Sequence, residues 1–257
     1  MRFTSGKEYM NWEGKKLAFI GMSGVGKSAL SSYLDPANWT RVCTDFDLAV
    51  GPLRPELENF AGIDFPVGHD DISILSSYVG KLGKLELGGL DFVTFRERQR
   101  LHAIAERQTF EELIDKLKQI SGSAIIDAGG SLVEILDFEN NDPLRESLAE
   151  LVFFVFIEAT PDEVSKLIKR QLAAPKPMFY QPDFLDLALT DFGRAIEDTD
   201  PDEFIRFVFP RLCEHRAPRY RALAQEAGVR VTLADANRVR TDSELHQLIV
   251  EAIDNAN

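Results

Sequence analysis

The hydrophobic pattern of the chain alternates between short apolar runs and longer amphipathic stretches. The apolar runs lack the alternation of buried and exposed positions seen in half-exposed strands, which predicts strands of a parallel sheet covered on both faces. These runs are KLAFIG (16–21), TRVCTD (40–45), SAIIDA (123–128), LVFFVFIE (151–158) and VRVTLA (229–234). Amphipathic stretches between them predict helices. The alternation of strands and helices therefore indicates a doubly wound α/β layer fold.

Two amphipathic stretches carry clear helix signals. Residues 95–120 are expected to form a long helix, since apolar residues recur along it in a way typical of one buried stripe. The expected stripe is Leu101, Ile104, Leu113, Leu117 and Ile120. After the fourth apolar run, Thr160 has the side chain of an N-cap and Pro161 suits the first helical turn.

Two long segments do not follow the strand–helix alternation. Residues 48–94 and 171–205 contain many glycines and prolines and read as irregular. Long irregular segments in a compact domain are usually lids or binding loops. We therefore expect a single domain over residues 1–257, with a substrate-binding insertion at 48–94 and a lid subdomain at 171–205.

Composition limits the possible partners. The 257-residue chain has a formal net charge of −13, which argues against sequence-independent binding to nucleic acid or to anionic membranes. A local basic site for a small anionic molecule stays possible. Cys43 and Cys213 are too few for a disulfide framework, and no apolar run is long enough to cross a bilayer. We expect a cytoplasmic protein that is a monomer or a weak homodimer.

One glycine-rich motif is typical of loops that bind nucleotide phosphates. GMSGVGKS fits G-x-x-x-x-G-K-S from Gly21 to Ser28, after a predicted strand and before a predicted helix. Backbone N–H groups of such a loop turn toward the phosphates of ATP. Lys27 is expected to reach the β- and γ-phosphates, and the Ser28 hydroxyl to bind Mg²⁺. The residues expected to contact the nucleotide here are Gly21, Ser23, Gly24, Val25, Gly26, Lys27, Ser28 and Ala29.

Acidic residues at predicted strand ends are candidate magnesium ligands. Asp127 ends AIID and Asp45 ends RVCTD, and parallel strands bring their carboxyl ends to the edge where the phosphate loop lies. Asp47 is expected to point the same way as Asp45 from an extended chain and could contact the acceptor instead. A helix cap or a loop turn is the alternative interpretation for each aspartate.

Taken in order, these motifs resemble the shikimate kinase family of P-loop kinases. The phosphate loop matches that of the family, TDFD resembles its D-x-D motif, and DAGGS resembles the glycine-rich loop under the substrate. The resemblance implies a five-stranded parallel sheet of order 2-3-1-4-5. It also implies that Asp45 serves Mg²⁺ and Asp47 binds substrate hydroxyls, and that Gly129 and Gly130 lie under the substrate ring.

The same resemblance implies further contacts. TFRERQ makes Arg96 a ligand of the acceptor carboxylate, and HRAPRY makes Arg216 the second one. Arginine supplies the planar paired donors that a carboxylate prefers. On the adenine side, the resemblance implies contacts from Arg170, Asn237 and Arg238, and in the lid it places Lys176 at the transferred phosphate.

Some positions depart from the family pattern. Ser131 replaces a third glycine, Gln99 replaces an acid, and Lys176 replaces the lid arginine, while the 48–94 stretch is longer than in the family. These departures favour a different or larger acceptor, or a weaker kinase.

The sequence thus predicts transfer of the ATP γ-phosphate to a hydroxyl of a small carboxylated, polyol-like acceptor, shikimate or a relative. Lys27, Asp47 and Lys176 would be the catalytic residues. The alternative is a nucleotide-dependent ATPase switch that binds a macromolecular partner through residues 48–94.

Overall fold

The structure is a computed structural model that describes residues 2–62 and 72–256. Its residues group into two compact units. Unit 1 comprises 1–44, 111–167 and 217–257, and unit 2 comprises 45–110 and 168–216. One unit boundary falls after the first residue of α3 (Thr44–Val50). The others fall inside α6 (Phe92–Gln119), α9 (Pro161–Leu172) and α11 (Pro201–Ala227).

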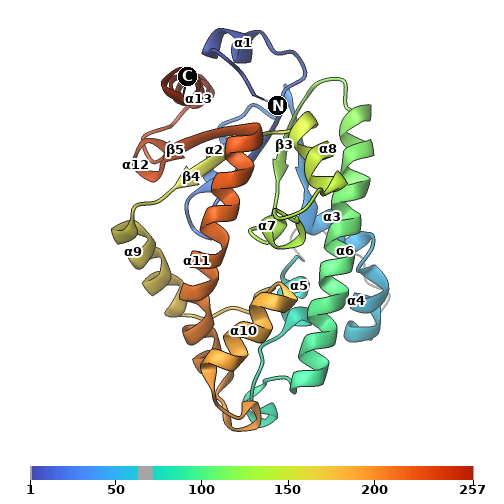
Figure 1. Cartoon of the computed structure of the whole chain (residues 1–257). Coiled ribbons are helices and arrows are strands. Elements are labelled where there is room, and N and C mark those ends of the chain that lie inside the picture. The colour runs from blue at the N-terminus through green and yellow to red at the C-terminus, as the bar shows by residue number, and fades with distance from the viewer. Residues whose placement is uncertain (1, 63–71, 257) are drawn as a thin grey trace. The chain divides into compact units, whose positions relative to one another are not determined.

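Unit 1 is built on a five-stranded parallel sheet of order β2-β3-β1-β4-β5, as predicted (Figure 1). The strands are β1 (Lys16–Ile20), β2 (Trp39–Cys43), β3 (Ser123–Asp127), β4 (Phe153–Glu158) and β5 (Gly228–Thr232). In the central strand, Leu17 pairs with Ile125 of β3 on one side and with Phe153 of β4 on the other. This pairing directs the carboxyl ends of β1, β3 and β4 to one edge.

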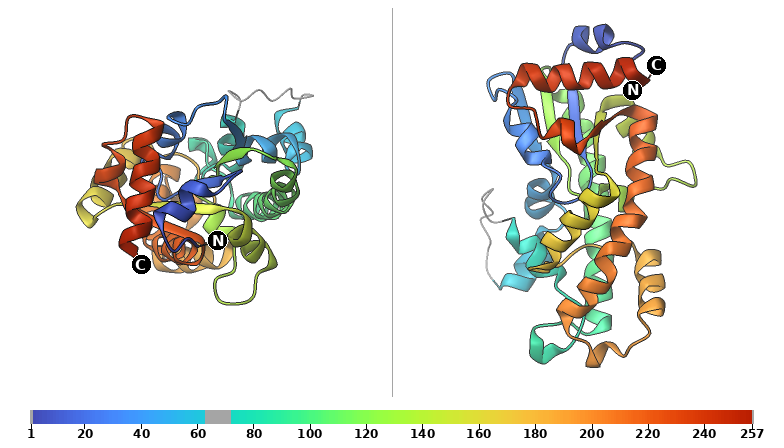
Figure 2. Two further views of the ribbon diagram at one scale, coloured as in Figure 1. Left: turned by 90° about the horizontal axis from the view of Figure 1, so that it is seen from above. Right: turned by 90° about the vertical axis from the view of Figure 1, so that its left-hand side faces the viewer.

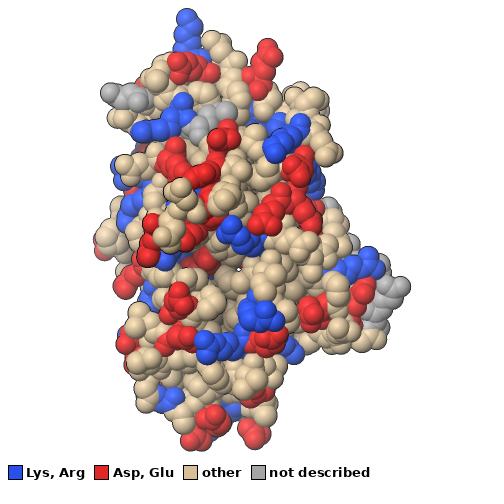
Figure 3. All heavy atoms as spheres, turned by 45° about the vertical axis from the view of Figure 1, so that its right-hand side comes forward, with Lys and Arg blue, Asp and Glu red and all other residues tan. Residues whose placement is uncertain are grey.

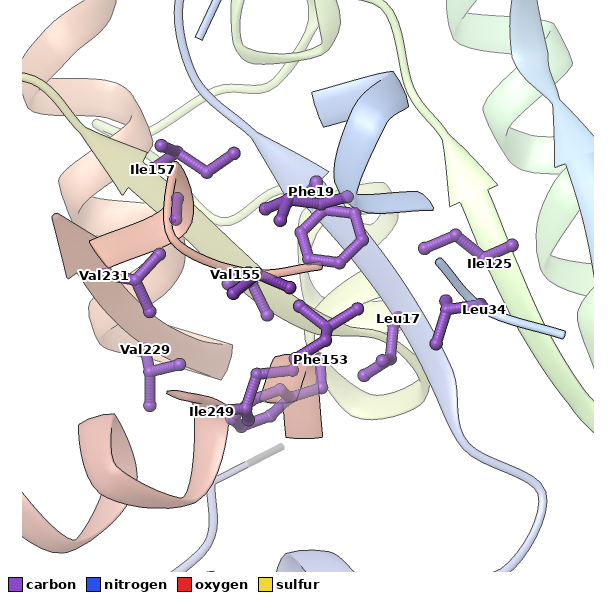
Figure 4. Packing of buried hydrophobic residues seen from close by; sticks show 14 of the residues in the cluster. Leu17, Phe19, Leu34, Ile125, Phe153, Val155, Ile157, Val229, Val231 and Ile249 are labelled. Atoms are coloured by element: carbon purple, nitrogen blue, oxygen red, sulfur yellow. The ribbon is translucent and has the colours of Figure 1, made fainter. Parts of the chain in front are cut away.

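Both faces of the sheet are covered. On one face, alternate strand residues pack with side chains of the flanking helices into one core cluster, part of which Figure 4 shows. The helices of this layer are α1 (Gly6–Asn11), α2 (Lys27–Ser32), α12 (Leu233–Ala236) and α13 (Asp242–Ala256). Figure 2 shows α1 beside α13, where the backbone N–H of Gly6 donates to Asp254 at 2.7 Å.

The opposite face packs against α11. Phe156 of β4 points to this face and stacks on Tyr220 of α11, with ring centroids 5.7 Å apart. Helix α8 (Pro143–Leu151) joins this layer through an ion pair of 3.2 Å between Arg145 and Glu226. Burial on both faces explains why the strand sequences lack polar alternation. Unit 1 is therefore a three-layer α/β/α fold.

The predicted start of α9 is confirmed in detail. Thr160 accepts from the N–H of Glu163 at 3.4 Å, and the Glu163 carboxylate accepts from the N–H of Thr160 at 2.8 Å. This reciprocal pair is a capping box, which satisfies two N–H groups that the helix itself leaves without partners.

Unit 2 is mostly helical, whereas the sequence predicted irregular segments here. Its elements are α3 (Thr44–Val50, from its second residue), α4 (Arg54–Ala61), α5 (Ser73–Val79), η2 (Leu85–Leu87), α10 (Pro182–Phe192), η3 (Ile196–Asp198) and parts of α6, α9 and α11. Residues 63–71 of the predicted insertion lie outside the described residues. Apolar side chains of α3, α4, α5 and α6 form a core of their own.

The predicted insertion and the predicted lid fold together within unit 2. The N–H of Lys84 donates to the carbonyl of Thr199 at 2.9 Å, and Lys81 pairs with Asp202 at 2.6 Å. Gly83 has a φ of +146°, and a side chain there would come within 2.7 Å of the Thr199 carbonyl oxygen. Glycine is thus required where the two segments meet.

The predicted apolar stripe on α6 is wrong at one position. Ile104 is 54% exposed, whereas Leu113 and Leu117 are buried. Nine residues separate Ile104 from Leu113, and at about 100° per residue these side chains lie on opposite sides of the helix. The other buried residues follow Leu113 and Leu117 at helical spacing along the same face: Phe95, Gln99, His102, Glu106 and Thr109. One face of α6 is therefore buried along both halves of the helix, and the sequence missed its N-terminal half because polar side chains occupy most of it.

Charged side chains of both signs are interspersed on the face shown in Figure 3. Across residues 2–62 and 72–256, helices that combine the length and the apolar character needed to span a membrane are absent.

Pairing of β5 with β4 depends on a glycine. A Cβ atom on Gly228 would lie 1.9 Å from the carbonyl oxygen of Phe154, so Gly228→Ala must displace the β5 backbone. We expect a loss of about 1–3 kcal/mol in the free energy of unfolding, measured by urea denaturation. Gly122→Ala is the matched control, because a Cβ there would meet open space. If both variants were equally stable, the backbone of Gly228 could not lie as close to the Phe154 carbonyl as the structure shows.

Candidate phosphate-binding and acceptor sites

The phosphate loop connects β1 directly to α2. Gly21, Gly24 and Gly26 all have positive φ angles, of 140°, 86° and 94°. A side chain on Gly21 would come within 3.0 Å of the Ile157 carbonyl oxygen, so this residue is confined both by its backbone and by β4. Val25 is buried in the core and anchors the middle of the loop. The loop is therefore fixed at its start and centre.

Lys27 lies across the loop. Its Nζ donates to the carbonyls of Gly21 at 2.9 Å and of Met22 at 3.1 Å. The ammonium group thus sits over the loop rather than extending into solvent. Ser28, the second residue of α2, is exposed. This arrangement leaves an ammonium donor and a hydroxyl at the same turn, as a phosphate loop requires.

Asp127 ends β3, the neighbour of β1 in the sheet, so it belongs to the edge that carries the loop. The Thr44 hydroxyl donates to the backbone carbonyl of Asp127 at 3.1 Å and ties the end of β2 to the end of β3. The sequence analysis did not predict a role for Thr44. Its partner lies 83 positions later in the chain, so a local sequence pattern does not indicate this hydrogen bond.

Electrostatic forces at Asp127 oppose one another. Desolvation by the surrounding protein raises the pKa of this carboxyl group, while Lys27 and then Arg41 act to lower it. The residue still reaches solvent. Arg41, which also donates to the Ser31 carbonyl at 3.1 Å, was likewise not predicted as part of the site.

The glycine pair after β3 is held by a tyrosine. The Tyr220 hydroxyl donates to the carbonyl of Gly130 at 2.6 Å, and the ring is buried against Phe156. Gly129 accepts a hydrogen bond from Leu132 at the start of α7 (Leu132–Ile135). The sequence placed Gly129 and Gly130 at the site but missed Tyr220, although Tyr220 lies in the motif that contains Arg216.

The predicted adenine-side residues belong to both units. Asn237 and Arg238 follow α12 in unit 1, both exposed, and Arg238 pairs with Asp235 at 2.9 Å. Arg170 lies in the part of α9 that belongs to unit 2. A groove of about 890 Å³ in unit 1 includes Arg238 in its lining, together with Thr160, Thr232 and residues of α13.

The prediction that Asp45 and Asp47 share an extended chain is wrong. Strand β2 ends at Cys43, and α3 begins at Thr44, so both aspartates lie in the first helical turn. Residues two apart on a helix are separated by about 200° and do not point the same way. Acidic residues in a first turn are also favoured by the helix dipole, which gives this pair a structural role as well.

Both predicted carboxylate-binding arginines have partners within unit 2. Arg96, about half-exposed, donates to Asp186 of α10 at 2.7 Å. Arg216 donates to the backbone carbonyl of Phe179 at 2.9 Å. Lys176 is exposed. Gln99, which replaces an acid of the family pattern, contacts the backbone on both sides of Phe179.

The chain is similar to a solved structure of known function. It is the 1.7 Å crystal structure of shikimate kinase from Bacteroides thetaiotaomicron, with 16% identical residues, over 91% of this chain and 94% of that one. The TM-score is 0.41, so the similarity carries no argument by itself. No family model matches the chain, and no curated protein matches it. The fold assignment rests on the sheet order of unit 1.

The raised pKa of Asp127 predicts a trade-off between stability and metal binding. A carboxyl group whose pKa is raised by folding costs stability once the pH exceeds its ordinary value, and this cost persists at neutral pH. We expect Asp127→Asn to raise the thermal unfolding midpoint at pH 7 and to weaken Mg²⁺-dependent nucleotide binding. The gain in midpoint should shrink as the pH falls toward the ordinary aspartate pKa. If Asp127→Asn raised the unfolding midpoint equally at all pH values, the raised pKa of Asp127 could not be the cause.

Proposed function

We propose that this protein is an ATP-dependent kinase that phosphorylates a hydroxyl of a small carboxylated acceptor, shikimate or a relative. The observation that supports this proposal most is the phosphate loop, in which Lys27 lies across the loop at the sheet edge that also carries Asp127. An ammonium group and a carboxylate at one edge suit ATP with a divalent cation.

The residues of unit 1 fit Mg²⁺ and ATP chemically. Hard oxygen ligands are available there from the Ser28 hydroxyl and the Asp127 carboxylate, and Asp45, the first residue of unit 2, is the further candidate. When bound, Mg²⁺ would neutralise charge on the β- and γ-phosphates. Among residues 2–62 and 72–256, clusters of three or more His, Cys, Asp or Glu side chains suited to a metal are absent. Few protein ligands are expected for a cation that also binds phosphates.

The acceptor's carboxylate would bind the guanidinium groups of Arg96 and Arg216. Arg96 must then exchange Asp186 for the acceptor, and exposed ion pairs of this kind contribute only about 0–1 kcal/mol. Gly129 and Gly130, held by Tyr220, would support the acceptor ring. Asp47 would bind its hydroxyl groups.

In the transfer step, the acceptor oxygen would attack the γ-phosphorus in line with the bond to the β–γ bridging oxygen. That bond breaks, ADP leaves with the electron pair, and Asp47 accepts or directs the proton of the hydroxyl. Lys27 and Lys176 would offset negative charge on the transferred group. Such catalysis consists mainly of positioning and electrostatic stabilisation.

The second candidate function is a nucleotide-dependent switch. Residues 48–94 present Leu85 and Leu87 on η2 at 64% and 58% exposure, which favours contact with a macromolecule. The acceptor arginines are not needed for such a function. Turnover of ATP would then respond to a protein partner and not to a small acid.

The kinase proposal predicts acceptor-dependent ADP release. We expect release from ATP·Mg²⁺ to increase with one member of a panel of hydroxy-acids that includes shikimate, with phosphate appearing on that acceptor. Lys27→Ala should lower ATP affinity about 10- to 100-fold, because a charged hydrogen bond contributes about 1.5–3 kcal/mol. Turnover that no acceptor stimulates would favour the switch.

Arg96 can be tested against a neighbour on the same helix. Arg96→Lys loses the planar pair of donors, so we expect the acceptor KM to rise about tenfold while the KM for ATP stays constant. Arg100→Lys is the matched control, since Arg100 is also exposed and pairs with Glu97 on α6. If both substitutions changed the acceptor KM equally, Arg96 would not be a ligand of the acceptor.

A further inference from the structure

Two side chains, Gln99 and Arg216, form hydrogen bonds with backbone groups of three consecutive residues, Met178–Tyr180. Gln99 Nε2 donates to the Met178 carbonyl at 3.1 Å, and Gln99 Oε1 accepts from the Tyr180 N–H at 2.9 Å. Between them, the Phe179 carbonyl accepts from Arg216. We call residues 178–180 the strap. Helices α6 and α11 thus both bind its backbone.

Side-chain packing reinforces these hydrogen bonds. The ring of Phe179 stacks on His102 with centroids 5.0 Å apart, and burial lowers the pKa of His102 to about 4, which keeps this imidazole neutral at pH 7. Tyr180 is 1% exposed and lies against the rings of Phe95, Phe184 and Phe204. A segment bound and packed in this way does not open as a loose loop.

A glutamine side chain satisfies both outer contacts of the strap at any pH. Its amide group carries N–H donors and a carbonyl acceptor, and the Met178 carbonyl and the Tyr180 N–H need one of each. An ionised glutamate would set a carboxylate oxygen against the Met178 carbonyl. Gln99 is 1% exposed, so water cannot replace a lost partner at low cost.

We propose that Gln99 is a positioning residue that fixes the strap and thereby the backbone that carries Lys176, two residues before it. The proposal rests on the kinase function proposed above, in which Lys176 offsets charge on the transferred phosphate. Lys176 itself is exposed, and its reach depends on the backbone from which it extends.

Amide hydrogen exchange tests the strap without reference to activity. In the wild-type protein, the Tyr180 amide should be strongly protected. Gln99→Met keeps the side-chain volume but removes both hydrogen bonds, and we expect exchange at Tyr180 to accelerate about tenfold or more. Amides of β1 and β4 should be unchanged. Gln119→Met is the matched control, at an exposed glutamine of the same helix.

A double-mutant cycle tests the link to Lys176. We expect Gln99→Met to lower kcat about tenfold with little change in the KM for ATP, and Lys176→Ala to have a similar effect. If Gln99 acts through Lys176, Gln99→Met should lower kcat no further in the Lys176→Ala background. Equal factors in both backgrounds would overturn the positioning role.

The outcomes separate the two proposals. Rapid exchange of Tyr180 in the wild-type protein overturns the strap, and this measurement needs no variant to fold. If no acceptor is phosphorylated and Lys176→Ala leaves the rate of ATP turnover unchanged, the kinase proposal is wrong. The proposed positioning of Lys176 is then wrong as well. If an acceptor is phosphorylated and Gln99→Met does not change the rate, the kinase proposal stands and the positioning role of Gln99 is wrong.

Discussion

The pairing of β1 between β3 and β4 is the constraint on which the rest of unit 1 depends. Because all three strands run parallel, their carboxyl ends meet at one edge. Gly21 leaves β1 at that edge with a φ of 140° and packs against the carbonyl of Ile157. The same pairing sets Asp127 at the end of the adjacent strand. The phosphate loop is thus positioned by the sheet and not by its glycines alone.

The features of unit 1 were predictable because their signals are local. Strand burial on both faces leaves uniformly apolar runs, and the loop motif lies between a strand and a helix in the sequence itself. Thr160 and Glu163 form a capping box within one turn. Asp45 and Asp47 were misassigned because TRVCTD reads as a continuous strand. Helix α3 starts at Thr44, and the hydroxyl of Thr44 donates to the Asp127 carbonyl. The two residues are 83 positions apart, so a local stretch of sequence does not reveal this contact.

Unit 2 could not be predicted for a related reason. Its two segments, which look irregular alone, bury apolar surface against long helices that are remote in sequence. Residues of 48–94 form a core with Ala105 of α6, and Tyr180 and Phe192 pack on Phe204 of α11. Lys84 and Thr199 are far apart in the chain, yet their backbones are hydrogen bonded. Ile104 shows a different limit within one helix, since the buried face of α6 is lined in its N-terminal half by the polar residues Gln99, His102 and Glu106. The periodicity of apolar residues does not report a buried face whose side chains are polar.

The internal partners of the arginines bear on which acceptor the proposed kinase could select. In a chain of net charge −13, arginines find acidic or carbonyl partners within the fold, as Arg96 does with Asp186 and Arg216 with Phe179. An exposed ion pair is exchanged at little cost, whereas a half-buried guanidinium that holds a backbone carbonyl is not. An acceptor would therefore compete easily for Arg96, whereas Arg216 would have to keep its contact with the Phe179 carbonyl. A planar carboxylate accepts two parallel hydrogen bonds from one guanidinium group, so it could replace Asp186 on Arg96 with a contact of the same kind. A single hydroxyl group would gain less from this arginine, and the proposed kinase would for this reason prefer an acid.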